Sequence, residues 1–365
     1  MPSGTLAGLL ADAAAAVPGR PALIEATRTT SFAALDNLAR RVATGLAALG
    51  IGIGDPVALW LPNTPAHYAL TFAIWRVGAT VVGVNTRFRA KEVEDIVGRT
   101  GAKALVYWPG FKDIDFEAIL NSIDPELLTK LELVIAHDAD GAPDVPGCVL
   151  GRPVTRLSGL ADASPMVEDH GSPNRPAQIF TTSGTTSAPK FVLHAHASLR
   201  EHAKRVAAHW QADAEDAVLF QTAPLCGTVG LVNLTISAAA RSPQVIQALF
   251  DPAEAGELIK RKKVTHLANK AYGMSECLAY FALRPRDVPL AEAMHGGGFV
   301  INPASGMRIR NTDTGALCQP EEPGELEVCG PTLMLEYADN PDANAKAWTA
   351  DGWLRTGDLG YLRAD

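Results

Sequence analysis

Residues 178–196 read QIFTTSGTTSAPKFVLHAH, and this stretch decides how the rest of the chain is interpreted. An apolar run at 178–180 leads into six glycine or hydroxyl residues at 181–186, which are followed by Pro189, Lys190 and a second apolar run. Small residues let backbone N–H groups and hydroxyls approach phosphate oxygens, because no bulky side chain blocks the way. Lys190 adds a positive charge. The stretch predicts a phosphate-binding loop without Walker spacing, and the alternative is a solvated turn.

The chain before this loop alternates helix and strand patterns. After Ser31, apolar residues at 35, 38, 42, 46 and 49 recur in steps of three and four, which predicts a helix capped by Ser31 and ended by Gly50. Similar patterns then predict strands at 57–61, 80–84 and 104–108, and helices at 67–77 and 91–99. This alternation is typical of a mostly parallel sheet covered by helices.

Composition suggests three parts. The segment between 138 and 176 is rich in proline, glycine and acidic residues, which is typical of a surface connection. Strand and turn patterns dominate beyond about residue 301, as in GELEVCGP. We therefore predict an α/β fold with a first α/β subdomain at 1–176, a second with the phosphate loop at 177–300, and a small β-rich subdomain at 301–365.

Charge and composition limit the partners of the protein. The chain of 365 residues is 47% hydrophobic with a net charge of -8, so it can bury a large core but lacks a broad basic face. A duplex-binding protein needs such a face, and the basic run at 260–263 is better interpreted as a solvated helix end. We expect no nucleic-acid partner, whereas small anionic ligands remain compatible.

Cysteine usage and the termini indicate a compartment. The five cysteines are scattered and form no CxxC pair, so neither a disulfide framework nor a zinc site is predicted. The N-terminal residues lack the pattern of a signal peptide, and no window has the apolar run of a membrane span. We expect a cytoplasmic protein, and the oligomeric state stays open.

Four motifs in order resemble the adenylate-forming (AMP-binding) superfamily, in its acyl-CoA synthetase branch. TTSGTTSAPK at 181–190 resembles the phosphate-binding signature, and AYGMSE at 271–276 resembles the aromatic–Gly–x–Thr/Ser–Glu motif. Residues 49–88 resemble the N-terminal core, and 324–362 resemble the run through the TGD motif. The resemblance covers nearly the whole chain. It implies two helix-flanked, mostly parallel sheets plus a small β-rich subdomain, as in the family's large N-terminal domain.

The resemblance also implies which residues bind the nucleotide. The phosphate loop corresponds to Thr182, Ser183, Gly184, Thr185, Thr186 and Lys190. Tyr272 would stack on adenine with Gly273 beside it, and Asp358 would bind the ribose hydroxyls.

Three residues are implied in catalysis: Lys190, Ser275 and Glu276. Ser275 would lie near the α-phosphate and the acyl carboxylate. Glu276 would hold Mg²⁺, which prefers hard oxygen ligands. The implied reaction is attack of a carboxylate on the α-phosphorus of ATP, followed by transfer of the acyl group to coenzyme A.

The substrate prediction rests on a segment without acidic residues. Residues 218–250 contain no acidic residue, whereas amino-acid-activating relatives commonly hold the α-ammonium there with an aspartate. Burying an unpaired cation is costly, so we predict a fatty or aromatic acid rather than an amino acid. Two alternatives stay open: loading of the acyl group onto a carrier-protein phosphopantetheine, and a non-catalytic nucleotide- or acyl-binding relative.

The sequence departs from the family at several positions. Glycine is common where this chain has Ser187 and Phe191, so we expect reduced backbone freedom in the loop. Gly227 stands where a histidine often lines the acyl pocket, which leaves that role unassigned. His196 matches a histidine that follows the loop, and His194 has no counterpart; we interpret both as structural.

Two larger segments of the family are absent. Only residues 267–270 separate His266 from the AYGMSE motif, where the family has several dozen residues with a glycine-rich strand end. The family's hinge and C-terminal lid domain, with a lysine that assists adenylation, would follow Asp365. Either the protein is a truncated relative or the chain omits these segments. We favour omission, because truncation would expose core surface.

Overall fold

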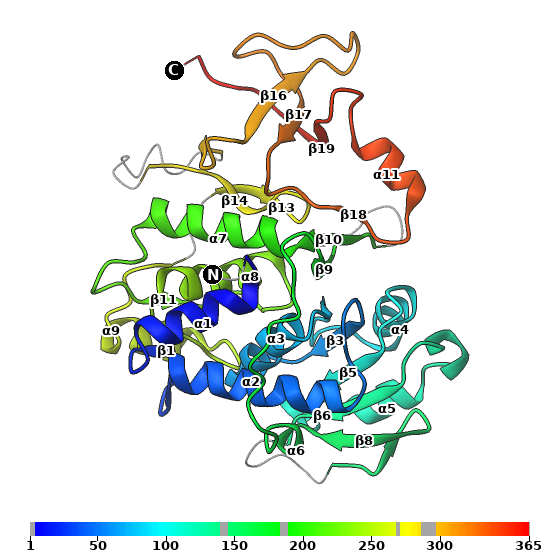
Figure 1. The fold of residues 1–365 in the computed structure, drawn as a ribbon. Coiled ribbons are helices and arrows are strands. Elements are labelled where there is room, and N and C mark those ends of the chain that lie inside the picture. Colours follow the sequence, from blue (N-terminus) through cyan, green and yellow to red (C-terminus); the bar gives the residue numbers. More distant parts are fainter. Residues whose placement is uncertain (1–3, 139–144, 183–188, 268–270, 286–296, 365) are drawn as a thin grey trace.

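The computed structural model describes residues 4–138, 145–182, 189–267, 271–285 and 297–364 (Figure 1). Within these ranges, every helix is too short or too polar to cross a bilayer.

The largest sheet has nine strands in the order β18-β10-β9-β4-β3-β5-β6-β8-β7. The strands from β9 to β8 in this order pair in parallel, whereas the outer pairs at both ends are antiparallel. Their bounds are β3 Pro56–Trp60, β4 Thr80–Gly83, β5 Ala104–Tyr107, β6 Leu133–Ala136, β7 Cys148–Val149, β8 Arg152–Arg156, β9 Pro176–Thr181, β10 Phe191–Ala195 and β18 Glu336–Tyr337.

Strand alternation places the two faces of the large sheet in different apolar cores. In β3, Val57 and Leu59 face one core, and Ala58 and Trp60 face the other, because successive side chains point to opposite faces of a sheet. The helices contributing to the first core include α2 Phe32–Ala48 and α3 Pro65–Arg76, and those of the second are α4 Ala90–Arg99 and α5 Phe116–Asn121. The central strands are thus covered on both faces (Figure 1).

The local predictions for the first hundred residues are confirmed. Helix α2 begins after Ser31, whose Oγ accepts a hydrogen bond of 3.2 Å from the N–H of Ala34. Gly50, with a φ of +83°, follows its end and adopts the left-handed conformation that favours glycine. The predicted strands at 57–61, 80–84 and 104–108 correspond to β3, β4 and β5.

The proline- and glycine-rich stretch contains more structure than predicted. We interpreted 138–176 as a surface connection, but β7 and β8 lie within it, and β8 pairs in parallel with β6. These strands are short and only partly buried, so their sequence lacks a clear apolar run. The other short elements of this half are α6 Leu157–Leu160 and the 3₁₀ helices η1 Phe111–Asp113 and η2 Pro125–Leu128.

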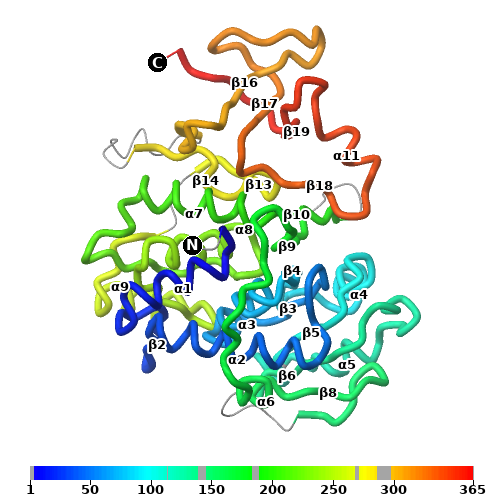
Figure 2. The backbone as a smooth tube through the Cα atoms, in the orientation of Figure 1, coloured from blue at the N-terminus to red at the C-terminus, as the bar shows by residue number. Residues whose placement is uncertain are grey.

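A second, four-stranded sheet combines two strands from the N-terminal region with two strands from residues 219–245. Its order is β11-β12-β1-β2, with parallel pairs except between β1 and β2. The bounds are β1 Pro21–Ile24, β2 Thr29–Ser31, β11 Leu219–Phe220 and β12 Gln244–Val245, and the neighbouring helices are α1 Leu6–Ala16, α7 His196–Trp210, α8 Thr228–Ala240 and α9 Pro252–Arg261. Figure 2 shows α1 beside α8, although they are far apart in sequence. The prediction of two helix-flanked, mostly parallel sheets is confirmed.

Two small antiparallel sheets complete the fold at one end of the molecule (Figure 1). One has the order β13-β14-β15 and the other β16-β17-β19. Their bounds are β13 Ala271–Met274, β14 Leu278–Leu283, β15 Phe299–Val300, β16 Gly306–Arg310, β17 Gly324–Cys329 and β19 Leu354–Gly360, with α11 Pro341–Ala347 beside them. The β-rich character beyond residue 301 matches the sequence pattern. The subdomain boundaries at 176 and 300 stay predictions, since the nine-stranded sheet takes strands from both sides of residue 176.

Candidate active site

Two adjoining cavities lie between the large sheet, α8 and the β13–β14 hairpin. The larger has a volume of about 700 Å³ and the smaller about 390 Å³. Thr228, Met274 and Ser275 line both, so these residues mark the junction between them.

The larger cavity brings together three segments that are distant in sequence. Thr181, Thr182 and Pro189 come from the β9–β10 hairpin, Glu276 follows β13, and Asp358 comes from β19. The two ends of the predicted phosphate loop therefore line the same cavity as Glu276 and Asp358. The loop residues Ser183, Gly184, Thr185 and Thr186 lie outside the described residues, as does Ser187.

The β9–β10 hairpin closes the base of the phosphate loop. The N–H of Thr182 donates to the carbonyl of Lys190 at 3.0 Å, and the N–H of Lys190 donates to Oγ1 of Thr182 at 3.2 Å. Phe191 pairs with Thr181 in regular strand register and is buried, with the Arg99 guanidinium 4.5 Å from its ring centroid. Phe191 is therefore an extended strand residue that packs in the core, and the expected reduction of backbone freedom in the loop stays a prediction.

A tyrosine connects Lys190 to Glu276. Lys190 Nζ lies 4.5 Å from the ring centroid of Tyr337, and the Tyr337 hydroxyl donates to Oε1 of Glu276 at 2.7 Å. Glu276 is only 6% exposed. Burial and the neighbouring Glu276 charge raise the pKa of the Tyr337 phenol well above its usual range, so it remains a donor. Sequence reasoning missed Tyr337, because nothing in its surroundings distinguishes it from a core tyrosine.

Ser275 is held from two sides at the junction of the cavities. Its Oγ lies 3.3 Å from Oγ1 of Thr228, and its carbonyl oxygen lies 2.7 Å from Nε2 of His194. Nearby, Gly273 lines the smaller cavity, and a Cβ at this position would lie 2.4 Å from the carbonyl oxygen of Leu278. Only glycine allows the hairpin strands to approach so closely. Sequence reasoning did not identify Thr228, which a single hydroxyl residue at a helix start does not reveal.

The smaller cavity has an uncharged wall. Its described lining contains no Asp, Glu, Lys, Arg or His; the residues are Asn85, Ala223, Pro224, Cys226, Gly227, Thr228, Val229, Gly230, Gly273, Met274, Ser275 and Ala279. Burial raises the pKa of the Cys226 thiol to about 12, so this side chain is neutral at physiological pH. Gly227, the position where a histidine was anticipated, is the N-cap of α8.

Asp358 and Tyr272 contact each other at the edge of the larger cavity. The Tyr272 hydroxyl donates to Oδ2 of Asp358 at 2.8 Å, and burial raises the pKa of the Tyr272 phenol well above its usual range. Asp358 lines the larger cavity. The stacking of Tyr272 on adenine stays a prediction.

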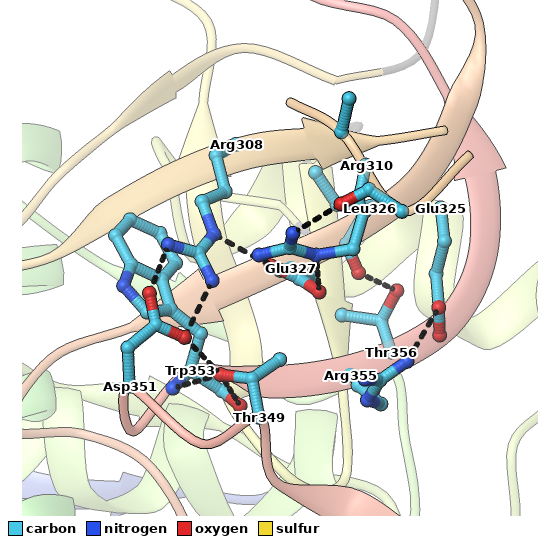
Figure 3. A network of polar contacts seen from close by, with 12 residues as sticks. Arg308, Arg310, Glu325, Leu326, Glu327, Thr349, Asp351, Trp353, Arg355 and Thr356 are labelled. Atoms are coloured by element: carbon cyan, nitrogen blue, oxygen red, sulfur yellow. Dashed lines mark hydrogen bonds and ion pairs between the residues drawn. The ribbon is translucent and has the colours of Figure 1, made fainter. Parts of the chain in front are cut away.

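Ion pairs hold the small sheet that carries Asp358 (Figure 3). The Glu327 side chain is fully buried, and its carboxylate accepts hydrogen bonds from Arg308 at 2.5 Å and from Arg310 at 2.6 Å. Burial alone would raise the pKa of Glu327, but the two guanidinium groups outweigh this effect and lower the pKa. Arg308 also lies over the ring of Trp353 at 4.2 Å and pairs with Asp351.

Backbone and hydroxyl contacts continue from this cluster to Asp358. Thr356 Oγ1 donates to the carbonyl of Leu326 at 2.7 Å and accepts from the N–H of Asp358 at 3.1 Å. Figure 3 shows Thr356 and Arg355 of β19 beside Leu326 and Glu325 of β17. The position of Asp358 therefore depends on how firmly β17 holds β19.

The fold as a whole matches that of known enzymes. It resembles o-succinylbenzoate coenzyme A synthetase from Bacillus subtilis, solved in complex with ATP and a magnesium ion, with a TM-score of 0.77 and 22% identity over 98% of this chain and 96% of that chain. A family model described as AMP-binding enzyme matches residues 10–270. The chain therefore belongs to the AMP-binding enzyme family.

Curated relatives of known name are similar over most of the chain. One is the methyl-dioxo-octahydro-indenyl-propanoyl:CoA ligase of Mycobacterium tuberculosis, at 28% identity over 95% of this chain and 74% of the relative. Another is the mitochondrial medium-chain acyl-CoA ligase of Macaca fascicularis, at 26% identity over 99% of this chain and 69% of the relative. That alignment extends over 438 residues, more than the 365 of this chain, so the relative has insertions within the matched span.

Proposed function

We propose that this protein is an AMP-forming acid–thiol ligase that activates a carboxylic acid with ATP and then transfers the acyl group to coenzyme A. The observation that carries the proposal is the pair of cavities. Glu276, Asp358 and the base of the phosphate loop line the larger one together with residues of α4 such as Glu92 and Asp95, and an uncharged pocket adjoins it through Thr228 and Ser275. The larger cavity suits the nucleotide, and the smaller one suits the acyl group.

In the first step, an oxygen of the carboxylate attacks the α-phosphorus of ATP, and the bond from this phosphorus to the β-phosphate oxygen breaks. Pyrophosphate leaves and acyl-AMP remains. Both reactants are anions, so the protein has to offset negative charge where they meet. The first turn of α8, which begins at Thr228, faces this junction, and helix N-termini present N–H groups that favour anions.

The chain's own residues fit a magnesium ion at Glu276. Glu276 is a buried carboxylate in the cavity wall, and Tyr337 fixes one of its oxygens. The described residues hold no group of three or more His, Cys, Asp or Glu side chains close enough to bind a metal, and Mg²⁺ usually takes few protein ligands beside phosphates and water. When bound, the ion neutralises phosphate charge. Lys190, beside Tyr337, would add a second positive charge on this side.

The uncharged pocket supports the substrate class. An α-ammonium group would be buried without a negatively charged partner, because the polar side chains of the described lining, Asn85, Thr228 and Ser275, are neutral, and this is costly. A fatty or aromatic acid leaves no charge there, so we propose this class over amino acids.

The second step releases AMP. The thiol of coenzyme A loses its proton, its sulfur attacks the acyl carbonyl carbon, and the bond from this carbon to the phosphate oxygen breaks. A carrier-protein phosphopantetheine presents the same thiol, so the acceptor has to be tested directly. The five unpaired cysteines support a reducing compartment, and we propose the cytoplasm.

The test is acid-dependent exchange of labelled pyrophosphate into ATP, followed by mass spectrometry of the thioester formed with either acceptor. We expect exchange with aliphatic or aryl acids, and a product with coenzyme A. Glu276→Gln should lower the exchange rate roughly 100- to 1,000-fold, the range for loss of one transition-state stabiliser. Asp358→Asn should mainly raise the KM for ATP.

Asp313→Asn is the matched control, since Asp313 is an exposed aspartate outside both cavity linings, in the connection between β16 and β17 of the sheet that also carries Asp358. ATP binding without exchange for any acid would favour a non-catalytic relative. Preferential exchange with amino acids would contradict the substrate class, and a product only with the holo-carrier would change the acceptor.

A further inference from the structure

Three histidines of β10 and α7 contact the backbone of residues 275–284, which follow β13. In each, Nε2 contacts a backbone carbonyl oxygen: His194 with Ser275 at 2.7 Å, His202 with Ala279 at 2.5 Å and His209 with Arg284 at 3.2 Å. His194 is the member of this set beside the site, because Ser275 precedes Glu276 and lines both cavities.

The chemistry of His194 defines the contact. Its side chain is fully buried, and burial lowers the pKa of the imidazole to about 4, so the ring is neutral at physiological pH. A neutral imidazole has one N–H, and a carbonyl oxygen can only accept. The proton is therefore on Nε2, and His194 donates to Ser275. The Phe180 ring, 5.8 Å away in an edge arrangement, holds the imidazole from the side.

Strand β10 connects this donor to the phosphate loop. Lys190 closes the base of the loop against Thr182, and His194 follows in the same strand with Gln178 of β9 as its partner. The strand pairs on both sides, with β9 and β18, and is therefore a rigid element. Tyr337, which donates to Glu276, lies in β18. The same three strands thus hold the loop base, the Ser275 carbonyl and the Glu276 carboxylate.

We propose that His194 is a positioning residue, which sets the Ser275–Glu276 backbone at a fixed distance from the phosphate loop. The proposal rests on the function proposed above for Glu276. Without this hydrogen bond, the segment can move away from β10. Glu276 would then bind Mg²⁺ beside the phosphates with lower affinity. The KM for the acid should be affected less, because most residues that line the smaller cavity come from residues 223–230.

The experiment compares four variants of the whole chain: His194→Leu, His194→Gln, His194→Asn and His209→Leu. The Gln amide nitrogen reaches approximately the position of Nε2, whereas the Asn nitrogen corresponds to Nδ1. His209→Leu is the matched control, since it removes the same kind of contact from α7 at a carbonyl outside both cavity linings. The readouts are hydrogen–deuterium exchange in residues 271–283 and the Mg²⁺ concentration that gives half-maximal pyrophosphate exchange.

We expect His194→Leu and His194→Asn to speed hydrogen exchange in this segment about tenfold and to raise the required Mg²⁺ about tenfold, as the loss of one buried hydrogen bond does. The KM for the acid should change less than threefold, and His194→Gln should restore both readouts at least in half. If the His194→Leu chain does not fold, the Gln and Asn pair decides.

Equal behaviour of His194→Gln, His194→Asn and His209→Leu in both readouts would overturn the proposal, because the contact would then have no local effect. The function of Glu276 is judged separately. If the unmodified chain shows no pyrophosphate exchange with any acid, the proposed function fails. Hydrogen exchange still measures whether His194 holds the segment.

Discussion

The middle of the large sheet and the small β16–β17–β19 sheet are stabilised by different forces. Every residue of β4 and β5 is buried, and both faces pack against apolar cores. In β19, most residues are exposed or half-buried, and its partner strand β17 is linked to β16 by the buried Glu327 with two arginines. The larger cavity spans both kinds of structure, with Thr181 on the first and Asp358 on the second. Nucleotide binding should therefore be sensitive to charge and pH where acyl binding is not.

The largest expected effect that distinguishes the regions is acidification. The buried residues His67, His194, His196 and His202 each have a pKa lowered to about 4. Between pH 6.5 and 4 the unfolded histidines bind protons and the folded ones do not. The free energy of unfolding therefore decreases as the pH is lowered through this range. Each histidine contributes at most about 1.4 kcal/mol per pH unit, several kcal/mol in total. Urea unfolding at pH 7, 5.5 and 4.5 measures this.

Glu327 acts in a lower pH range. Its pKa is lowered in the folded state, so its contribution is complete above the unfolded pKa of about 4.3 and is lost as the pH falls below that value. A stability profile that is flat from pH 7 to 4.5 would contradict the assignment of the four histidines as neutral.

Removal of a core ring tests the apolar region. Phe116 is fully buried, and its ring centroid lies 4.4 Å from that of Trp60 in an edge contact. Phe116→Ala should lower the free energy of unfolding by about 4 kcal/mol, because transfer and cavity costs add. Phe116→Leu, the control, should cost about 1 kcal/mol. The loss should be the same at low and high salt, and a strong salt dependence would show that charge contributes here too.

Removal of the buried carboxylate tests the charged region. Glu327→Ala leaves Arg308 and Arg310 without their shared partner and should cost about 3 kcal/mol. Since β17 holds β19, the KM for ATP should rise severalfold while the KM for the acid stays nearly constant. Parallel kinetics of Phe116→Ala give the comparison. Equal effects on both substrates would mean that the small sheet does not position Asp358.

The smallest effect concerns the exposed end of the same network. Asp351 pairs with Arg308 at 2.6 Å, but its side chain is 57% exposed, and solvent weakens such pairs. Asp351→Asn should change the free energy of unfolding much less than Glu327→Ala does, and the difference should shrink in 1 M salt. Thermal unfolding at two salt concentrations is sufficient. A loss as large as that of Glu327→Ala would mean that exposure does not separate the two carboxylates.

Local structure was largely predictable from the sequence, whereas the residues of the candidate site were identified by the resemblance to a family. The spacing of apolar residues after Ser31 defined α2, and short apolar runs defined β3, β4 and β5, because these signals depend on neighbours a few residues apart. The resemblance to a known family brought attention to Glu276 and Asp358, which line one cavity. Their chemical roles stay predictions.

Only the tertiary structure decided which distant segments meet. No local pattern pairs β1 with β12, and none shows that His194 and Tyr337 contact the Ser275–Glu276 segment. Buried histidines and tyrosines have the same sequence surroundings whether they fill a core or hold a site. Their partners are chosen by sheet order and packing across the whole chain, and these long-range contacts leave no periodic pattern in the sequence.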